Sequence, residues 1–143
     1  ESWLHVKNKA FFFSELFRVL KPVGRLINVD WVHRSQHYSD LMREFVLVDG
    51  LSFHLCTIEE YKTQLELAGF TALDLQDNTA HHLQYSREYV DKLLNPAIRD
   101  LFIERFCRAE HEAYLMSWLM QSDIFSRGEI QVFTMKAEKA LSR

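Results

Sequence analysis

Histidines are the residues whose side chains could most readily do chemistry in this sequence, and few of them are spaced for it. His81 and His82 are adjacent, so their side chains project differently, and no third ligand follows at a useful spacing for a metal. His111 and Glu112 lack the second histidine of an H-E-x-x-H zinc motif. We therefore predict no metal site, a solvated loop around the first pair and ordinary helix surface around the second.

Composition excludes several other classes of function. The 143 residues are 48% hydrophobic and 26% charged, which is typical of one globular domain. With 17 basic and 20 acidic residues and no basic cluster, the chain is not expected to bind nucleic acid. No apolar run is long enough for a membrane span or a signal peptide, so a cytoplasmic location is the default expectation. Cys56 and Cys107 form no C-x-x-C pair, and we interpret them as small buried hydrophobic residues.

Residues 10–31 are expected to form a helix, a turn and a strand that would position a site. Apolar residues recur at spacings of three and four over residues 10–20, which predicts an amphipathic helix. Pro22 cannot continue that helix, and we expect Gly24 to supply the permissive backbone for a sharp turn. Consecutive apolar residues then predict a buried strand over 25–31. Asp30 stands near its carboxyl end, where open α/β sheets place their ligand crevices.

The rest of the chain predicts further helices and two more strands. Thr57 opens a helix with a capping box, and an alternating strand follows over residues 70–76. A helical insertion near residues 86–125 opens at Ser86, and the last strand covers residues 129–138. Together these elements predict an α/β fold with a short mixed sheet.

The string from Arg18 to Asp30, R-V-L-K-P-V-G-R-L-I-N-V-D, resembles a motif of class I S-adenosylmethionine-dependent methyltransferases. It matches the helix, the Lys-Pro-Gly-Gly turn and the fifth strand of that Rossmann-like fold, with Val23 in place of the first glycine. The order of elements is similar to the C-terminal half of sarcosine/dimethylglycine and phosphoethanolamine N-methyltransferases. The resemblance implies a single domain over residues 1–143 that is one half of such an enzyme.

The resemblance also implies that the cofactor-binding half is missing. That family holds S-adenosylmethionine with a glycine-rich loop after its first strand, and no G-x-G occurs here. We therefore expect a truncated or fragmentary small-molecule N-methyltransferase that does not bind the cofactor by itself. The alternative is a stand-alone small-molecule-binding or oligomerising domain, and a third reading is an unrelated α/β binder.

Catalytic residues are carried over from the phosphobase enzymes, in which an aspartate and a histidine four residues later lie beside the substrate. Glu1 and His5 stand at those positions. A histidine suits proton transfer from an amine nucleophile, although His5 could equally be a polar residue at a helix entry. Trp3 lies on the same segment and is expected to line the substrate site.

Further substrate-binding residues follow from the same resemblance. Trp31 matches an aromatic position that faces the substrate, where it could attract a methylated amine by a cation–π contact or simply pack. Leu47, Leu51 and Phe53 stand where those families hold the substrate phosphate with tyrosines and an arginine. An apolar trio cannot bind a phosphate, so an uncharged or hydrophobic small molecule fits better, with His54 the nearest polar group.

The resemblance predicts an oligomer as well. The last strand should lie antiparallel between the other two, which leaves the strand at Leu26 to Val29 without its usual neighbour. An exposed apolar edge invites another strand. We therefore expect a homodimer in which a second copy covers this edge.

Overall fold

The computed structural model describes residues 2–34 and 37–140 of the chain. Two units are distinguished: a sheet unit made of residues 1–36, 52–78 and 130–143, and a helical unit made of residues 37–51 and 79–129. The expectation that the whole chain behaves as one domain stays a prediction, and each unit is described by itself.

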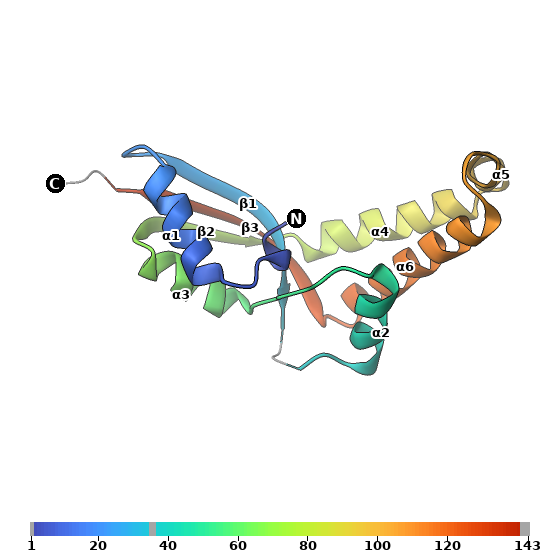
Figure 1. Ribbon diagram of the computed structural model, residues 1–143, viewed down its shortest axis with the longest axis horizontal. Helices are drawn as coiled ribbons and strands as arrows, with labels where there is room; N and C mark the ends of the chain where they lie inside the picture. Colours follow the sequence, from blue (N-terminus) through green and yellow to red (C-terminus); the bar gives the residue numbers. More distant parts are fainter. Residues whose placement is uncertain (1, 35–36, 141–143) are drawn as a thin grey trace. The chain divides into compact units, whose positions relative to one another are not determined.

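The sheet unit is built on three strands, β1 (Arg25–His33), β2 (Phe70–Asp77) and β3 (Ile130–Lys139). Their order is β1-β3-β2, and β3 runs antiparallel to both neighbours (Figure 1). The predicted strands and the central place of the last one are confirmed, but the sheet is antiparallel and not mixed, because β3 pairs with both neighbours. β1 is consequently an edge strand among the described residues.

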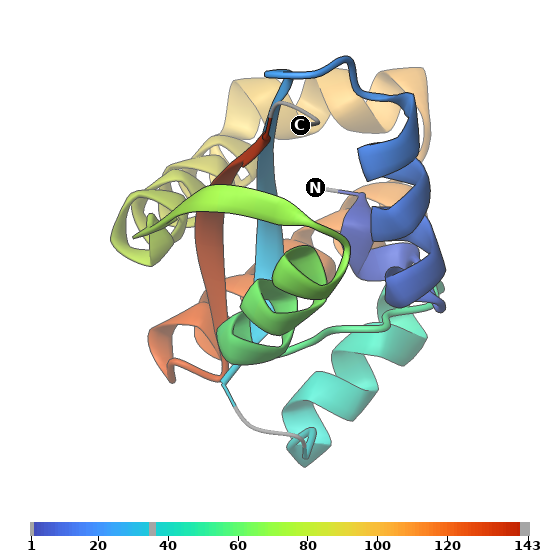
Figure 2. The same cartoon turned by 90° about the vertical axis from the view of Figure 1, so that its left-hand side faces the viewer.

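Two helices, α1 (Lys9–Val19) and α3 (Ile58–Leu67), lie on the same face of this sheet (Figure 2). A short 3-10 helix, η1 (Trp3–His5), precedes them. Apolar side chains from these helices and all three strands share one core, which comprises Trp3, Phe13, Val32, Tyr61, Leu65, Phe70, Met135 and Ala137. The two helices thus bury the apolar stripes that their sequence periodicity predicts.

Side chains cap both ends of α1. The Asn8 side chain accepts a hydrogen bond from the backbone N–H of Phe11 at the first turn. Lys139, at the end of β3, donates from Nζ to the carbonyl oxygens of Phe17 and Leu20 at 2.6 and 2.8 Å. A lysine there satisfies carbonyl groups that the helix itself leaves without partners.

The turn between α1 and β1 is made differently from the sequence prediction. Val23, not Gly24, takes the left-handed conformation, with a φ of 56°. Gly24 is needed for space instead, because a Cβ atom there would lie 2.6 Å from the carbonyl oxygen of Lys21. A glycine is therefore required at position 24 because of its small size. The expectation that Gly24 supplies a permissive backbone is wrong.

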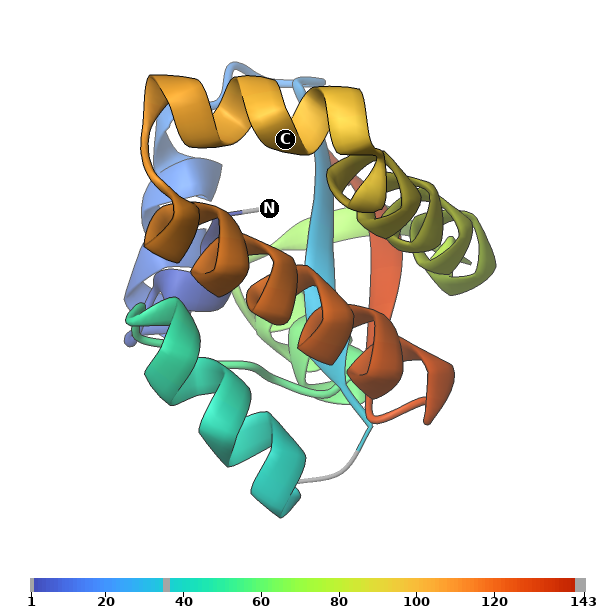
Figure 3. The ribbon, with the colours of Figure 1, turned by 90° about the vertical axis from the view of Figure 1, so that its right-hand side faces the viewer.

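The helical unit consists of α2 (Asp40–Asp49), α4 (Thr79–Leu94), α5 (Pro96–Arg105) and α6 (Arg108–Ser126). α4 and α6 run side by side and are joined by α5 (Figure 3). The predicted insertion is confirmed, but its first helix begins earlier than Ser86. That serine is buried inside α4 and donates from Oγ to the carbonyl oxygen of His82.

Three further expectations about the helical unit are wrong. His81 and His82 belong to α4, not to a loop. His111 is 4% exposed, with its Nε2 atom 3.0 Å from the carbonyl oxygen of Leu93, so it is no surface residue. Cys107 is exposed and not buried, because its sulfur caps α6.

Candidate functional site

The candidate site is built where the segment after η1 meets the loop that precedes α3. Lys9 fastens the two together: its Nζ donates to the carbonyl oxygens of Trp3, Val6 and His54 at 2.9, 2.9 and 2.6 Å. The backbone N–H of His54 donates in turn to the carbonyl oxygen of Leu4 at 2.7 Å. Charge-assisted hydrogen bonds are the stronger kind, so these segments are held in one arrangement.

His5 lies on this paired segment, and its side chain is exposed. Its Nδ1 atom is 2.8 Å from the carbonyl oxygen of Ser52. A carbonyl oxygen can only accept, so Nδ1 carries the proton and the Nε2 atom of the neutral ring bears the lone pair. The imidazole is therefore oriented with its basic nitrogen directed away from the backbone.

A row of aromatic rings continues from His5 toward the buried Trp31. The His5 and Phe53 ring centroids are 5.3 Å apart, and Phe53 stacks on Trp31 at 6.0 Å with an interplanar angle of 17°. Three residues proposed for catalysis and substrate binding from separate parts of the sequence thus form one contiguous row. His54 follows Phe53 directly and lines the adjoining cavity.

The other predicted site residues are not part of this row of rings. Trp3 is 8% exposed and packs in the core of the sheet unit, which leaves it little open surface. Leu47 and Leu51 belong to the helical unit, where they are 82% and 54% exposed. Glu1 lies outside the described residues. Within the sheet unit, the structure brings together the rings of His5, Phe53 and Trp31.

Asp30, which the sequence analysis noted at the end of the strand but did not assign a role, is a buried polar group next to Trp31 in β1. Asp30 is fully buried, and its carboxylate oxygens accept from the backbone N–H of Trp31 at 3.0 Å and from the Tyr61 hydroxyl at 3.1 Å. Burial raises the pKa of Asp30 above its ordinary value, and it raises the pKa of Tyr61 as well.

Lys9 belongs to the same buried environment. It is 6% exposed, with Nζ 5.6 Å from the centroid of the Tyr61 ring, and burial lowers its pKa. Burial likewise raises the pKa of the Cys56 thiol. The spacing of Lys9 four residues before Phe13 could have revealed its burial, because residues i and i+4 share a helix face.

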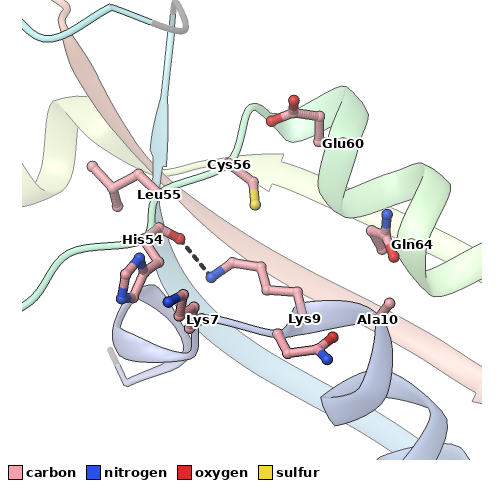
Figure 4. Close-up of a pocket in the computed structure, with 9 residues that line it drawn as sticks. Lys7, Lys9, Ala10, His54, Leu55, Cys56, Glu60 and Gln64 are labelled. Atoms are coloured by element: carbon pink, nitrogen blue, oxygen red, sulfur yellow. Dashed lines mark hydrogen bonds between the residues drawn. The ribbon is translucent and has the colours of Figure 1, made fainter.

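A cavity of about 830 Å³ opens beside this lysine. Its walls come from the start of α1, the loop before α3 and the first turns of α3, and they comprise Lys7, Asn8, Lys9, Ala10, His54, Leu55, Cys56, Glu60 and Gln64. In Figure 4 the Lys9 side chain extends along the cavity to the His54 carbonyl, with the Cys56 sulfur pointing toward it. The mixture of basic, acidic and amide side chains suits a polar ligand.

Two kinds of feature are absent from the described residues. No group of three or more histidine, cysteine, aspartate or glutamate side chains within residues 2–34 and 37–140 is placed to hold a metal ion. In the same part of the chain, no helix combines the length and the apolarity that crossing a membrane requires.

Known proteins are similar in sequence to this chain. Phosphoethanolamine N-methyltransferase 1 of Zea mays is 25% identical over 126 residues, which cover 88% of this chain and 24% of that protein. The chain thus spans about a quarter of the length of this relative. No protein-family model matches the sequence.

Solved structures agree with the sequence comparison. Phosphoethanolamine N-methyltransferase 2 of Haemonchus contortus, in complex with phosphomonomethylethanolamine and S-adenosylhomocysteine, superposes with a TM-score of 0.88 at 16% identity, over 98% of this chain and 32% of that one. A cyclopropane synthase of Mycobacterium tuberculosis gives 0.85 at 18% identity, over 96% and 53%. The chain has a partial methyltransferase fold. The resemblance predicted from the sequence is confirmed.

The glycines of this methyltransferase-like chain are placed for other tasks than holding a cofactor. Gly50 ends α2 with a φ of 72°, and Gly69 and Gly128 follow α3 and α6 with φ values of 102° and 68°. Gly24 makes room in a turn. None of these four positions forms a glycine-rich loop of the kind that lets a backbone approach an adenosyl group closely.

Proposed function

We propose that this chain is the substrate-side part of an S-adenosylmethionine-dependent methyltransferase that methylates a small amine, and that the methyl donor is held by a part outside this sequence. The observation that carries the proposal is the His5–Ser52 hydrogen bond, which leaves Nε2 as the basic nitrogen of a ring that lies beside Phe53. The similarity to N-methyltransferases along 88% of the chain supports it.

The proposed chemistry on this side is acceptance of a proton. A protonated amine has no lone pair and cannot act as a nucleophile, so it must lose a proton before it can be methylated. His5 Nε2 is oriented to accept that proton, since Nδ1 is already committed to Ser52. The partly exposed Phe53 ring beside His5 would hold the cationic form of the amine by cation–π attraction, with the buried Trp31 ring stacked against it.

The substrate we propose is an amine without a phosphate group. Relatives are named phosphoethanolamine N-methyltransferases, but the positions that resemble their phosphate site are Leu47, Leu51 and Phe53 here. None of these side chains can donate a hydrogen bond to a phosphate. An ethanolamine-like or more apolar amine therefore suits the chain better than a phosphoamine.

Nuclear magnetic resonance titration tests the site. Dimethylethanolamine, added to the isotope-labelled 143-residue chain, should shift the ring signals of His5 and Trp31, whereas phosphoethanolamine should bind more weakly. His5→Asn, which keeps a donor for Ser52 but loses the base, should weaken the response, and the exposed control His81→Asn should leave it unchanged. Unshifted ring signals at millimolar amine, or tighter binding of phosphoethanolamine, would contradict this proposal.

Calorimetric titration with S-adenosylhomocysteine tests where the methyl donor is held. We expect no binding to the chain alone. Binding at micromolar concentration would show that this sequence completes a cofactor site, and the placement of the donor outside the chain would be abandoned.

The alternative of a stand-alone small-molecule-binding domain is supported by one observation, the cavity beside Lys9. On this alternative, amines or carboxylates would shift the signals of His54 and Cys56 instead of those of His5 and Trp31. Lys7→Met, at the exposed rim of the cavity, would then weaken binding.

Two broader expectations belong to the same proposal. A net charge of −3 supports a protein that does not use nucleic acid as a partner. We propose a cytoplasmic location for this activity, which cell fractionation of the tagged chain would check.

A further inference from the structure

The ammonium group of Lys9 has one donor for each carbonyl oxygen that it contacts. Its three N–H groups match three acceptors, the carbonyl oxygens of Trp3, Val6 and His54 at 2.9, 2.9 and 2.6 Å. The side chain is 6% exposed, so water has little access to these bonds. An uncharged amine has two N–H groups, and one of the three carbonyl oxygens would then remain without a donor.

These acceptors lie at both ends of the hydrogen bond that orients His5. Trp3 stands two residues before His5, and Val6 directly follows it. His54 stands two residues after Ser52, whose carbonyl oxygen is 2.8 Å from the Nδ1 atom of His5. One buried ammonium group therefore holds both the segment that carries the base and the loop that carries its hydrogen-bond acceptor.

The loop that carries Ser52 depends on such contacts for its shape, because residues 51–57 form neither helix nor strand. The backbone adds a bond from the N–H of His54 to the carbonyl oxygen of Leu4 at 2.7 Å. All of these groups belong to the sheet unit. Their hydrogen bonds are therefore made without any group from outside this sequence.

We propose that Lys9 is the positioning residue of the proton acceptor: its ammonium group keeps the Ser52 carbonyl oxygen within hydrogen-bond distance of His5 Nδ1. The inference rests on the proposed function, which assigns the base to His5. Without the ammonium group the three carbonyl oxygens would turn toward water, and the loop would shift with them. A histidine without a partner at Nδ1 adopts both neutral tautomers, so Nε2 would no longer be the basic nitrogen in every molecule.

Two-bond ¹H–¹⁵N spectra of the folded 143-residue chain test the proposal with matched variants. Lys9→Met should lower the population of the Nδ1–H tautomer of His5 at least about twofold, and it should weaken the response to dimethylethanolamine. Lys62→Met makes the same change at an exposed lysine of α3 and should alter neither readout. Leu65→Ala removes a buried side chain from the same core, and it should destabilise the sheet unit without changing the tautomer.

The outcomes separate this proposal from the proposed function. An unchanged tautomer in Lys9→Met, or an equal change in Leu65→Ala, would overturn the role of Lys9 even if the amine binds. A changed tautomer in Lys9→Met alone, in a chain whose wild type binds no amine, would support the role of Lys9 and contradict the proposed function.

The wild-type chain supplies a measurement that does not require any variant to fold. The ¹⁵N signal of the Lys9 ammonium group should be resolved at neutral pH, because burial and three hydrogen bonds slow the exchange of its protons with water. The exposed Lys7 ammonium group is the internal control, and its protons should exchange too fast to be seen. Equally fast exchange at both lysines would overturn the proposal.

Discussion

The Nδ1 atom of His5 and the carbonyl oxygen of Ser52 are 2.8 Å apart, and this one hydrogen bond decides which ring nitrogen is basic. We predict that the neutral His5 ring carries its proton on Nδ1. Two-bond ¹H–¹⁵N correlation spectra distinguish the tautomers directly. An Nε2-protonated ring would mean that the hydrogen bond does not persist in solution, and it would remove the base from the proposed site.

Lys9→Met should destabilise the sheet unit strongly. The change leaves three carbonyl oxygens, those of Trp3, Val6 and His54, without their donor. Loss of about 3 kcal/mol of unfolding free energy is expected, as is typical when a buried charged partner is removed. Urea denaturation measures this loss, and faster amide exchange at His54 would locate it.

Lys7→Met is the control for that experiment. Lys7 is exposed and lies two residues away on the same segment. Its removal should change the unfolding free energy by less than about 0.5 kcal/mol. Similar losses from both lysines would mean that the carbonyl contacts of Lys9 do not carry the effect.

Asp30 predicts a dependence of stability on pH. Its folded-state pKa lies above its value in the unfolded chain because of burial. The contribution of Asp30 to the free energy of unfolding is therefore fully present below about pH 4 and is lost as the pH rises through the folded-state pKa. Asp30→Asn cannot ionise, so the stability of this variant relative to the wild type should increase over that range.

Urea midpoints between pH 4 and pH 8 measure this difference. Tyr61→Phe offers a second readout, because the Tyr61 hydroxyl donates to the Asp30 carboxylate and lowers its pKa. Without that donor the folded-state pKa of Asp30 is higher. The stability of Tyr61→Phe should therefore keep falling up to a higher pH than that of the wild type. If the urea midpoints of Asp30→Asn and the wild type differ by the same amount at every pH, the raised pKa of Asp30 is refuted.

Two substitutions in the turn before β1 should change the stability of the chain in opposite directions. Val23→Asn should stabilise the chain by about 1 kcal/mol, since asparagine tolerates the left-handed conformation that Val23 holds at a φ of 56°. Gly24→Ala should destabilise it by about 2 kcal/mol, because the new Cβ would meet the Lys21 carbonyl oxygen at 2.6 Å. Thermal unfolding of both variants checks the reversal, and a stabilising Gly24→Ala would contradict the described turn.

Local rules allowed much of the fold to be predicted. The capping box at Thr57 appears in the structure where the sequence predicts it, since it is determined by a few neighbouring residues. Ser86 was misjudged because a serine can either begin a helix or bond back to a carbonyl inside one. Sequence spacing does not distinguish these two uses.

The candidate site was less predictable, because tertiary contacts create it. The resemblance indicated His5, Trp31 and Phe53, and the structure brings their rings into one row. The burial of Lys9 and Asp30 depends on groups from distant segments, and charged side chains are ordinarily expected at the surface.

The position of β3 in the middle of the sheet has a consequence for biosynthesis. Neither β1 nor β2 has a neighbour in the sheet until β3, the last of the three strands along the chain, leaves the ribosome. The Lys139 side chain that caps α1 arrives at the same late moment. The three-stranded sheet therefore cannot assemble until β3 has emerged, and the nascent chain exposes the apolar residues of β1 to chaperones until then.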